Sequence, residues 1–306
     1  MAVAKRIFLF LVVNLLVITT ITLVLSFFNV KPYLTAHGLD YTSLMVFCLI
    51  WGMGGAFISL ALSKVMAKWM MGVRIIDPST TDQRLSSLLT TVHELCKAAN
   101  LRHIPDVGIY TSPEPNAFAT GPSQRHALVA VSTGLLNRMS QKELEGVLAH
   151  EISHIANGDM VTMTLIQGVV NAFVMFLARA LAFVFSNLGG KSRSNSSPGS
   201  YLSYTLFVLL FQFVFMILGS IVVAWFSRLR EFRADLGGAQ VAGKENMIAA
   251  LEALQKMHGI QDPAVHKQAA FNSLQISSPK KTSWVRFFSS HPPLEERIQR
   301  LKDSFF

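Results

Sequence analysis

The chain has 306 residues, of which 51% are hydrophobic and only 15% charged, and its formal net charge is +9. A fully water-soluble fold is excluded, because a protein of this length cannot bury so much apolar surface and part of it must face lipid. Basic residues that flank the apolar segments explain this positive charge largely as a topological bias, so we do not interpret it as a nucleic-acid signal.

Four apolar stretches are long enough to cross a bilayer as helices. They cover residues 7–30, 41–63, about 160–187 and 201–227. A helix needs about 20 apolar residues to cross a hydrocarbon core of about 30 Å thickness. The first stretch is too long for a signal peptide and lacks the small residues of a cleavage site, so we expect it to remain in the mature protein. The third contains Arg179, to which the sequence assigns no definite role.

These spans divide the chain into membrane hairpins at 1–63 and 160–227 and soluble segments at 64–159 and 228–306. Basic residues beside the spans are more numerous on the side of the soluble segments, which places both termini and these segments in the cytoplasm. We expect the two soluble segments to form one domain that the second hairpin interrupts in sequence.

The first soluble segment predicts one helix followed by short strands. Apolar residues recur at helical spacing over 81–99, and short apolar runs at 107–110 and 127–132 are typical of strands. Between the two strands lies 116–121, with prolines on both sides. Proline cannot donate to a ladder, so this pattern predicts an edge strand.

A second helix is indicated by signals at both of its ends. Ser140 and Glu143 form the spacing of a capping box, and Gly158 follows the last residue of the apolar stripe. This helix contains His150-Glu151-Ile152-Ser153-His154, the pattern H-E-x-x-H.

Residues four apart share one helix face, so the imidazoles of His150 and His154 can converge on one ion, for which zinc is the expected metal. Glu151 can then take a proton from the water that the metal activates and return it to the departing amine. The alternative is a solvated helix face that carries two histidines by chance. The capped, amphipathic setting argues against that alternative.

A catalytic zinc site needs a third protein ligand. Glu231 and Asp235 follow the last apolar stretch and are four residues apart. Glu231 would complete the ligand set, and Asp235 would brace an imidazole N–H. The spacing alone leaves open that both carboxylates only pair with neighbouring arginines.

Four segments carry a resemblance to a known family, namely 116–121, 147–160, 227–235 and 291–298. They look like the HtpX family of bacterial heat-shock membrane zinc metalloproteases, and the resemblance covers nearly the whole chain. The related CAAX prenyl endopeptidases share the zinc motif and the closing His-Pro motif.

The resemblance implies an α-rich integral membrane protein with four transmembrane helices. Its cytoplasmic part would be a thermolysin-like (gluzincin) α+β zinc metalloprotease domain with a small sheet. The implied activity is zinc-dependent cleavage of misfolded or damaged membrane proteins, as quality control under stress, in the bacterial cytoplasmic (inner) membrane. The implied partners are polypeptide substrates and the bilayer.

The resemblance also implies roles for single residues, with one zinc ion per chain. The implied zinc ligands are His150, His154 and Glu231, with Asp235 behind them. Glu151 is implied to be the catalytic base. His291 and Arg297 are implied to stabilise the oxyanion or orient the substrate. The implied substrate-binding edge consists of Asn116, Ala117 and Phe118.

Three alternatives remain at the level of sequence. A prenyl-protein endopeptidase would use the same chemistry, although those relatives carry more spans. A membrane di-iron hydroxylase or desaturase needs several histidine clusters, whereas the other histidines here are scattered. A scaffold with a structural zinc has no need of Glu151. No motif assigns a function to 188–200 or 261–290.

Overall fold

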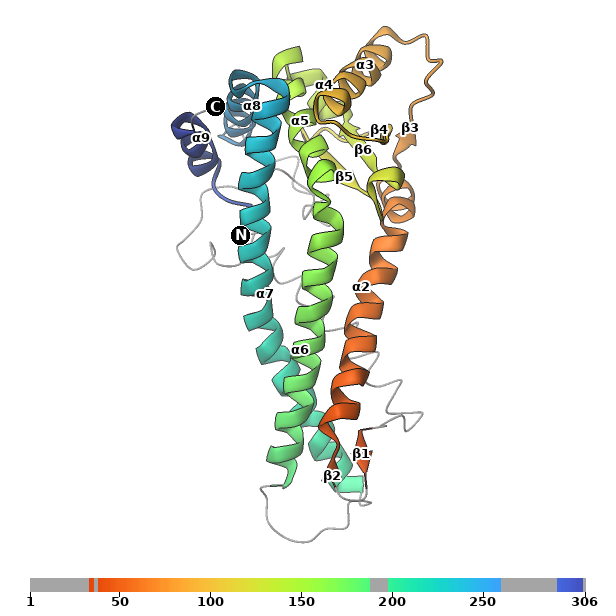
Figure 1. The fold of residues 1–306 in the computed structure, drawn as a ribbon, viewed down its shortest axis with the longest axis vertical. Coiled ribbons are helices and arrows are strands. Elements are labelled where there is room, and N and C mark those ends of the chain that lie inside the picture. The colour runs from red at the N-terminus through yellow and green to blue at the C-terminus, as the bar shows by residue number, and fades with distance from the viewer. Residues whose placement is uncertain (1–32, 36–37, 188–197, 260–290, 305–306) are drawn as a thin grey trace. The chain divides into compact units, whose positions relative to one another are not determined.

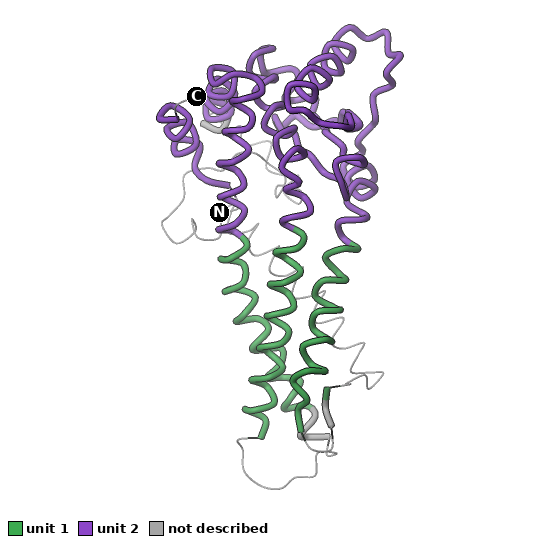
Figure 2. The backbone as a smooth tube through the Cα atoms, viewed as in Figure 1, with its two compact units in different colours: residues 1, 3–58, 164–223 green, residues 2, 59–163, 224–306 purple. Residues whose placement is uncertain are grey.

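The computed structural model describes residues 33–35, 38–187, 198–259 and 291–304. The predicted first span, 7–30, and the weakly patterned stretch 261–290 lie outside the described residues. The chain forms two compact units, which Figure 2 distinguishes by colour. Residues 3–58 and 164–223 form the first unit, and residues 59–163 and 224–306 form the second.

Three long helices are apolar enough to cross a membrane: α2 (Tyr41–Met71), α6 (Asp159–Asn187) and α7 (Pro198–Ala242). They correspond to three of the four predicted spans, and the fourth is the one outside the described residues. Two of them are longer than predicted, since α2 continues past Ser63 and α7 past Ser227 (Figure 1). Lysine and arginine end an apolar run, but they are good helix formers and do not end a helix.

Within the first unit, α2 and α6 approach closely at Gly52. A Cβ at this position would lie 2.6 Å from the backbone nitrogen of Ala172, so only glycine fits. Arg179 is buried in this unit, with its guanidinium 5.6 Å from the ring centroid of Phe47. The side chain therefore turns into the bundle. Near the start of α2, β1 (Leu34–Thr35) and β2 (Gly38–Leu39) form an antiparallel pair.

The second unit contains a four-stranded mixed sheet. Its strands are β3 (Arg74–Ile75), β4 (Asp106–Tyr110), β5 (Ala117–Thr120) and β6 (Leu128–Ser132), in the order β3-β4-β6-β5. β4 and β6 are parallel, and the other two pairs are antiparallel. β5 therefore forms an edge, as the flanking prolines predict. β3 was not predicted, because two residues are too short to show a pattern.

The described part of the second unit contains six further helical segments, and all of them except η1 contribute apolar side chains to the main core (Figure 1). They are α3 (Gln83–Ala98), η1 (Gln124–His126), α4 (Thr133–Arg138), α5 (Gln141–Asn157), α8 (Lys244–Gly259) and α9 (Leu294–Asp303). β6 alternates between two apolar clusters, with Val129 and Val131 in the core that includes α5 and with Leu128 and Ala130 in a smaller cluster that includes Ala67 of α2.

The H-E-x-x-H helix α5 begins and ends as its sequence predicts. The hydroxyl of Ser140 accepts from the backbone N–H of Glu143, and the carboxylate of Glu143 accepts from the backbone N–H of Ser140. Gly158 ends the helix with φ of 68°, in the left-handed region that favours glycine. These two ends fix the length of α5 and therefore the position of its histidines.

Candidate metal centre

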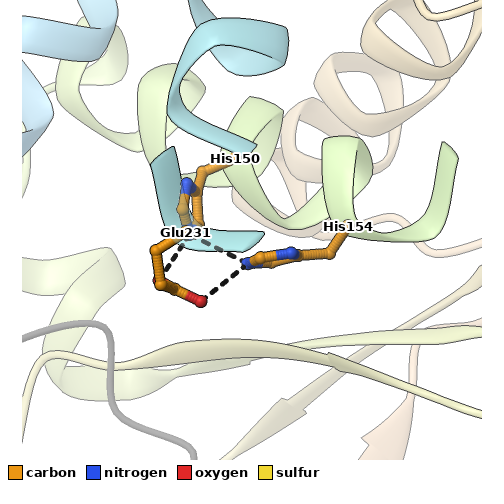
Figure 3. A group of neighbouring side chains, drawn as sticks. All are labelled: His150, His154 and Glu231. Atoms are coloured by element: carbon orange, nitrogen blue, oxygen red, sulfur yellow. Dashed lines mark hydrogen bonds and ion pairs between the residues drawn. The ribbon is translucent and has the colours of Figure 1, made fainter. Parts of the chain in front are cut away.

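Two side chains of α5 and one of α7 converge at a single buried point (Figure 3). His150 and His154 lie with their Nε2 atoms 3.1 Å apart. The Oε2 of Glu231 lies 3.4 Å from His150 Nε2, and the Oε1 lies 3.4 Å from His154 Nε2. One nitrogen or oxygen from each residue thus lies within 4.8 Å of the others, a spacing that could hold a metal ion.

A close approach of α7 to α5 brings Glu231 to the histidines although 77 residues separate it from His154 in sequence (231 − 154). Two turns beyond Glu231, a Cβ on Gly238 would lie 3.1 Å from the backbone nitrogen of His150, and one on Gly237 would lie 2.9 Å from Ser153 Oγ. The lack of side chains at Gly237 and Gly238 therefore allows the two helix backbones to approach.

The second nitrogen of His150 faces Asp235, one turn after Glu231 on α7. His150 Nδ1 lies 3.0 Å from Asp235 Oδ1. Arg297 of α9 holds the same carboxylate from the other side, donating from Nε to Oδ2 at 2.8 Å and from Nη2 to Oδ1 at 2.6 Å. This two-point ion pair fixes the carboxylate, and the carboxylate fixes the His150 ring.

His154 has an equivalent partner that the sequence did not reveal. Its Nδ1 lies 2.6 Å from Oδ2 of Asp159, which is buried at the first position of α6. Asp159 is five residues beyond His154, after the left-handed turn at Gly158. The short spacing H-x-x-x-G-D could have suggested it, since the turn folds the chain back toward the histidine. Both imidazoles are therefore oriented by carboxylates.

The carboxylates at this point raise the pKa of both imidazoles when no metal is present. Burial acts to lower the pKa of His150, but hydrogen bonds to Asp235 and Glu231 outweigh it and raise the pKa to about 9. For His154, burial likewise lowers the pKa, and the charge of Glu231 reverses this so that the net direction is upward. The carboxylates thus supply the negative charge that a cation would also neutralise.

His291 lies beside the carboxylate of Glu231, just before α9. Its Nδ1 lies 2.8 Å from Glu231 Oε2, and its side chain is mostly buried. Arg230 also contacts Glu231, with Nη2 at 3.0 Å from Oε1. Glu231 thus pairs with a neighbouring arginine, which was the alternative that the sequence left open, but it also contacts both histidines.

Arg297 is placed differently from the expectation that it contacts substrate. The side chain is completely buried, with 0% exposed, and its hydrogen bonds to Asp235 lie behind His150. Burial by itself lowers the pKa of this guanidinium, and the charge of Asp235 more than compensates and raises it. The position suits a group that supports the site from behind.

Glu151 follows His150 on α5 and is buried. Its carboxylate makes no hydrogen bond within the part of the chain that the structure describes. Glu151 is therefore not held by a partner there, unlike Glu231, Asp235 and Asp159.

The predicted substrate edge is anchored at Asn116, immediately before β5. The backbone N–H of Asn116 donates to Ser132 Oγ at 3.0 Å, and its carbonyl accepts from the Ser132 N–H at 2.9 Å. Its side-chain Nδ2 donates to the Tyr110 hydroxyl at 2.8 Å, while the buried Oδ1 has no hydrogen-bond partner among the described residues. Ala117 and Phe118 are buried, with 0% and 2% of each residue exposed, backbone included.

The chain resembles known proteins along its whole length. A family model described as Peptidase family M48 matches residues 82–304. The Protease HtpX homolog of Bacillus subtilis (strain 168) is 48% identical over 308 residues, covering 98% of this chain and 99% of that protein. Protease HtpX of Thioalkalivibrio sulfidiphilus (strain HL-EbGR7) is 47% identical over 302 residues, covering 97% of this chain and 98% of that protein.

One solved structure has a fold similar to that of this chain. The crystal structure of S. mikatae Ste24p matches with a TM-score of 0.59 at 19% sequence identity, over 95% of this chain and 67% of that chain. At this identity the match concerns the fold alone.

Proposed function

This chain belongs to peptidase family M48 and is a membrane-bound metalloprotease, and from that premise we propose that it is a zinc-dependent endopeptidase of membrane proteins. The observation that carries the proposal is the buried convergence of His150, His154 and Glu231 next to Glu151. The expected zinc ligands and the expected base are thus neighbours in space.

The donor set fits zinc. Two imidazole nitrogens and one carboxylate form a common catalytic zinc set, which leaves a fourth position open. His150, His154 and Glu231 would hold the ion, and Asp235 and Asp159 would orient the two rings from behind. When bound, the ion supplies Lewis-acid chemistry, in that it polarises the scissile carbonyl and makes a water molecule more acidic.

The chain's own residues supply the proton transfer and the positioning. Glu151 accepts a proton from the attacking water and returns it to the departing amine, and its carboxylate makes no hydrogen bond to another described residue. We assign Arg297 a positioning role, because it is fully buried and its hydrogen bonds hold Asp235. We assign His291 to orienting Glu231, and its stabilisation of a developing negative charge remains a prediction from family resemblance.

The substrate would be held by backbone pairing along β5. An extended chain that adds to a sheet edge is recognised through main-chain hydrogen bonds, which favours broad specificity. Two features support this role, namely the position of β5 at the edge of the described sheet and the buried Oδ1 of Asn116, which has no hydrogen-bond partner among the described residues. Ala117 and Phe118 would contribute their backbone.

Broad specificity together with apolar membrane helices suits the removal of misfolded or damaged membrane proteins. We place the protein in the bacterial inner membrane with both soluble segments in the cytoplasm, following the distribution of basic residues. We further assign a thermolysin-like fold to the second unit. A prenyl-protein endopeptidase is not favoured, because relatives named Protease HtpX are 47–49% identical over nearly the full chain, whereas the match to Ste24p concerns the fold at 19% identity.

The test compares Glu151→Gln with the wild type in detergent. The variant should retain one zinc per chain by elemental analysis but cleave an unfolded protein at least about a hundredfold more slowly, because a positioned general base contributes about 10²–10⁴ in rate. Glu145→Gln on the same helix is the matched control and should cleave normally. Wild-type cleavage by Glu151→Gln, or cleavage that chelators do not inhibit, would refute the proposal.

A further inference from the structure

The outer face of α7 stays apolar beyond the predicted end of the span. Exposed apolar side chains recur at intervals of three or four residues through Leu218, Val222, Trp225 and Leu229, and the exposed Arg233 follows on the same face. Trp225 is 50% exposed and Leu229 is 44% exposed. A soluble helix would carry polar groups on its outer face, so this surface is suited to an apolar environment as far as Leu229, and the charge of Arg233 suits the headgroup layer.

The opposite face of the same helix carries the candidate metal ligand. Glu231 is six residues beyond Trp225 on the unbroken helix α7, which corresponds to about 9 Å along its axis. Leu229 and Leu236 lie on either side of Glu231 in sequence but point outward, while Glu231 is fully buried. The apolar outer surface therefore reaches the level of the metal site, where Arg233 follows on the same face.

Helix α2 shows the same continuation. The predicted span ends at Lys64, but the amine of Lys64 is paired with Asp106 at 2.8 Å, and the exposed face remains apolar through Met66 and Trp69. Trp69 is 81% exposed. Exposed aromatic residues thus mark both ends of the helix, Tyr41 at its start and Trp69 near its end.

The length between these two aromatic residues matches a whole bilayer. Tyr41 and Trp69 are 28 residues apart, or about 42 Å along a helix, and a bilayer with its headgroup regions is about 40–45 Å thick. Tryptophan and tyrosine are enriched at membrane–water interfaces. Lys68 and Arg74 flank Trp69, and their charge suits phosphate groups. These residues mark the headgroup layer on the side of the second unit.

We propose that the metal centre is held at the depth of the lipid headgroups, so that the bonds it cleaves lie directly after a substrate's own membrane span. This inference rests on the proposed endopeptidase function and specifies its substrates. An extended chain rises about 3.3 Å per residue, so the 9 Å between Trp225 and Glu231 corresponds to about three residues of substrate. The preferred substrate is therefore an unstructured juxtamembrane segment.

The first experiment uses the zinc-loaded full chain in vesicles of phosphatidylethanolamine and phosphatidylglycerol. Two single-span substrates carry the same unstructured segment, either directly after the span or after a 20-residue EAAAK-type helix that raises it by about 30 Å. In vesicles the adjacent segment should be cleaved at least tenfold faster than the raised one, with cut sites in its first ten or so residues. In detergent, where no bilayer plane exists, the two rates should agree within about twofold.

The outcomes separate this inference from the proposed function. Equal cleavage of both substrates in vesicles would overturn the placement at the headgroups and leave the endopeptidase intact. Cleavage of neither substrate, in vesicles or in detergent, would overturn the proposed function and this inference with it.

A second measurement reports depth without any need for activity. A variant that retains Trp225 as its only tryptophan should be quenched more strongly by lipids with bromine near the headgroup than by lipids with bromine near the chain ends. The control retains only Trp51, which lies ten residues after Tyr41, or about 15 Å into the bilayer, and should show the reverse order. Absence of quenching of Trp225 by either lipid would contradict the inference.

Discussion

Asp159 provides the most direct test of how the metal centre is organised. Its carboxylate lies 2.6 Å from His154 Nδ1, is buried, and makes the ring present Nε2 toward Glu231. Loss of such a partner typically lowers metal affinity 10–100-fold, which corresponds to about 1.4–2.7 kcal/mol. We expect Asp159→Asn near the lower end of this range, because an amide oxygen can still accept the hydrogen bond, and Asp159→Ala near the upper end.

Zinc affinity should be measured by competition with a chromophoric chelator in detergent, since this reports the ligand set without relying on cleavage. Asp106→Asn is the matched control, because Asp106 also forms an ion pair in the second unit but contacts Lys64 and no histidine. The control should bind zinc like the wild type. If Asp159→Ala also binds zinc within about twofold of the wild type, Asp159 does not orient His154 and the reasoning fails.

Three further predictions concern the ligand set and its support. Glu231→Ala should leave the purified protein nearly zinc-free by elemental analysis, and an unchanged zinc content would exclude Glu231 as a ligand. Arg297→Leu leaves the carboxylate of Asp235 buried without its arginine partner, so this variant should lower the free energy of unfolding by about 3–5 kcal/mol. Combining Asp235→Asn with Arg297→Leu should recover part of that stability, as measured by thermal unfolding. The pKa of His150 is raised to about 9 in the metal-free protein, so zinc must displace a proton from this imidazole when it binds. The apparent zinc affinity should therefore rise about tenfold per pH unit from about pH 7 toward pH 9, and calorimetry should show proton release. Zinc binding that does not depend on pH would contradict this.

The parts of the fold that local patterns define were predictable. The capping box at Ser140, the turn at Gly158 and the H-E-x-x-H spacing fix α5 without reference to the rest of the chain. The prolines around 116–121 likewise identified β5 as an edge. Glu231 and Asp235 were recognisable because their spacing of four places them on one face of a helix.

The parts that depend on distant contacts were not predictable. The spacing of Arg297 gives no indication that it pairs with Asp235, which is 62 residues away, and only the family resemblance assigned it a role, toward the oxyanion or the substrate. Hydropathy ended the last span at Ser227 because arginines follow, although α7 continues unbroken to Ala242. A local pattern reports neither a partner that is distant in sequence nor a helix that continues through charged residues.

The connection between the metal ligands and the membrane helices has a consequence for biosynthesis. Gly158 links the histidine-bearing helix α5 directly to α6, and Glu231 arrives only on α7, after the chain has passed through the intervening hairpin. A ribosome-bound chain that ends before Glu231 holds two imidazoles and no third ligand. The nascent protein therefore cannot bring the three side chains together before the hairpin that connects the two helices has been synthesised.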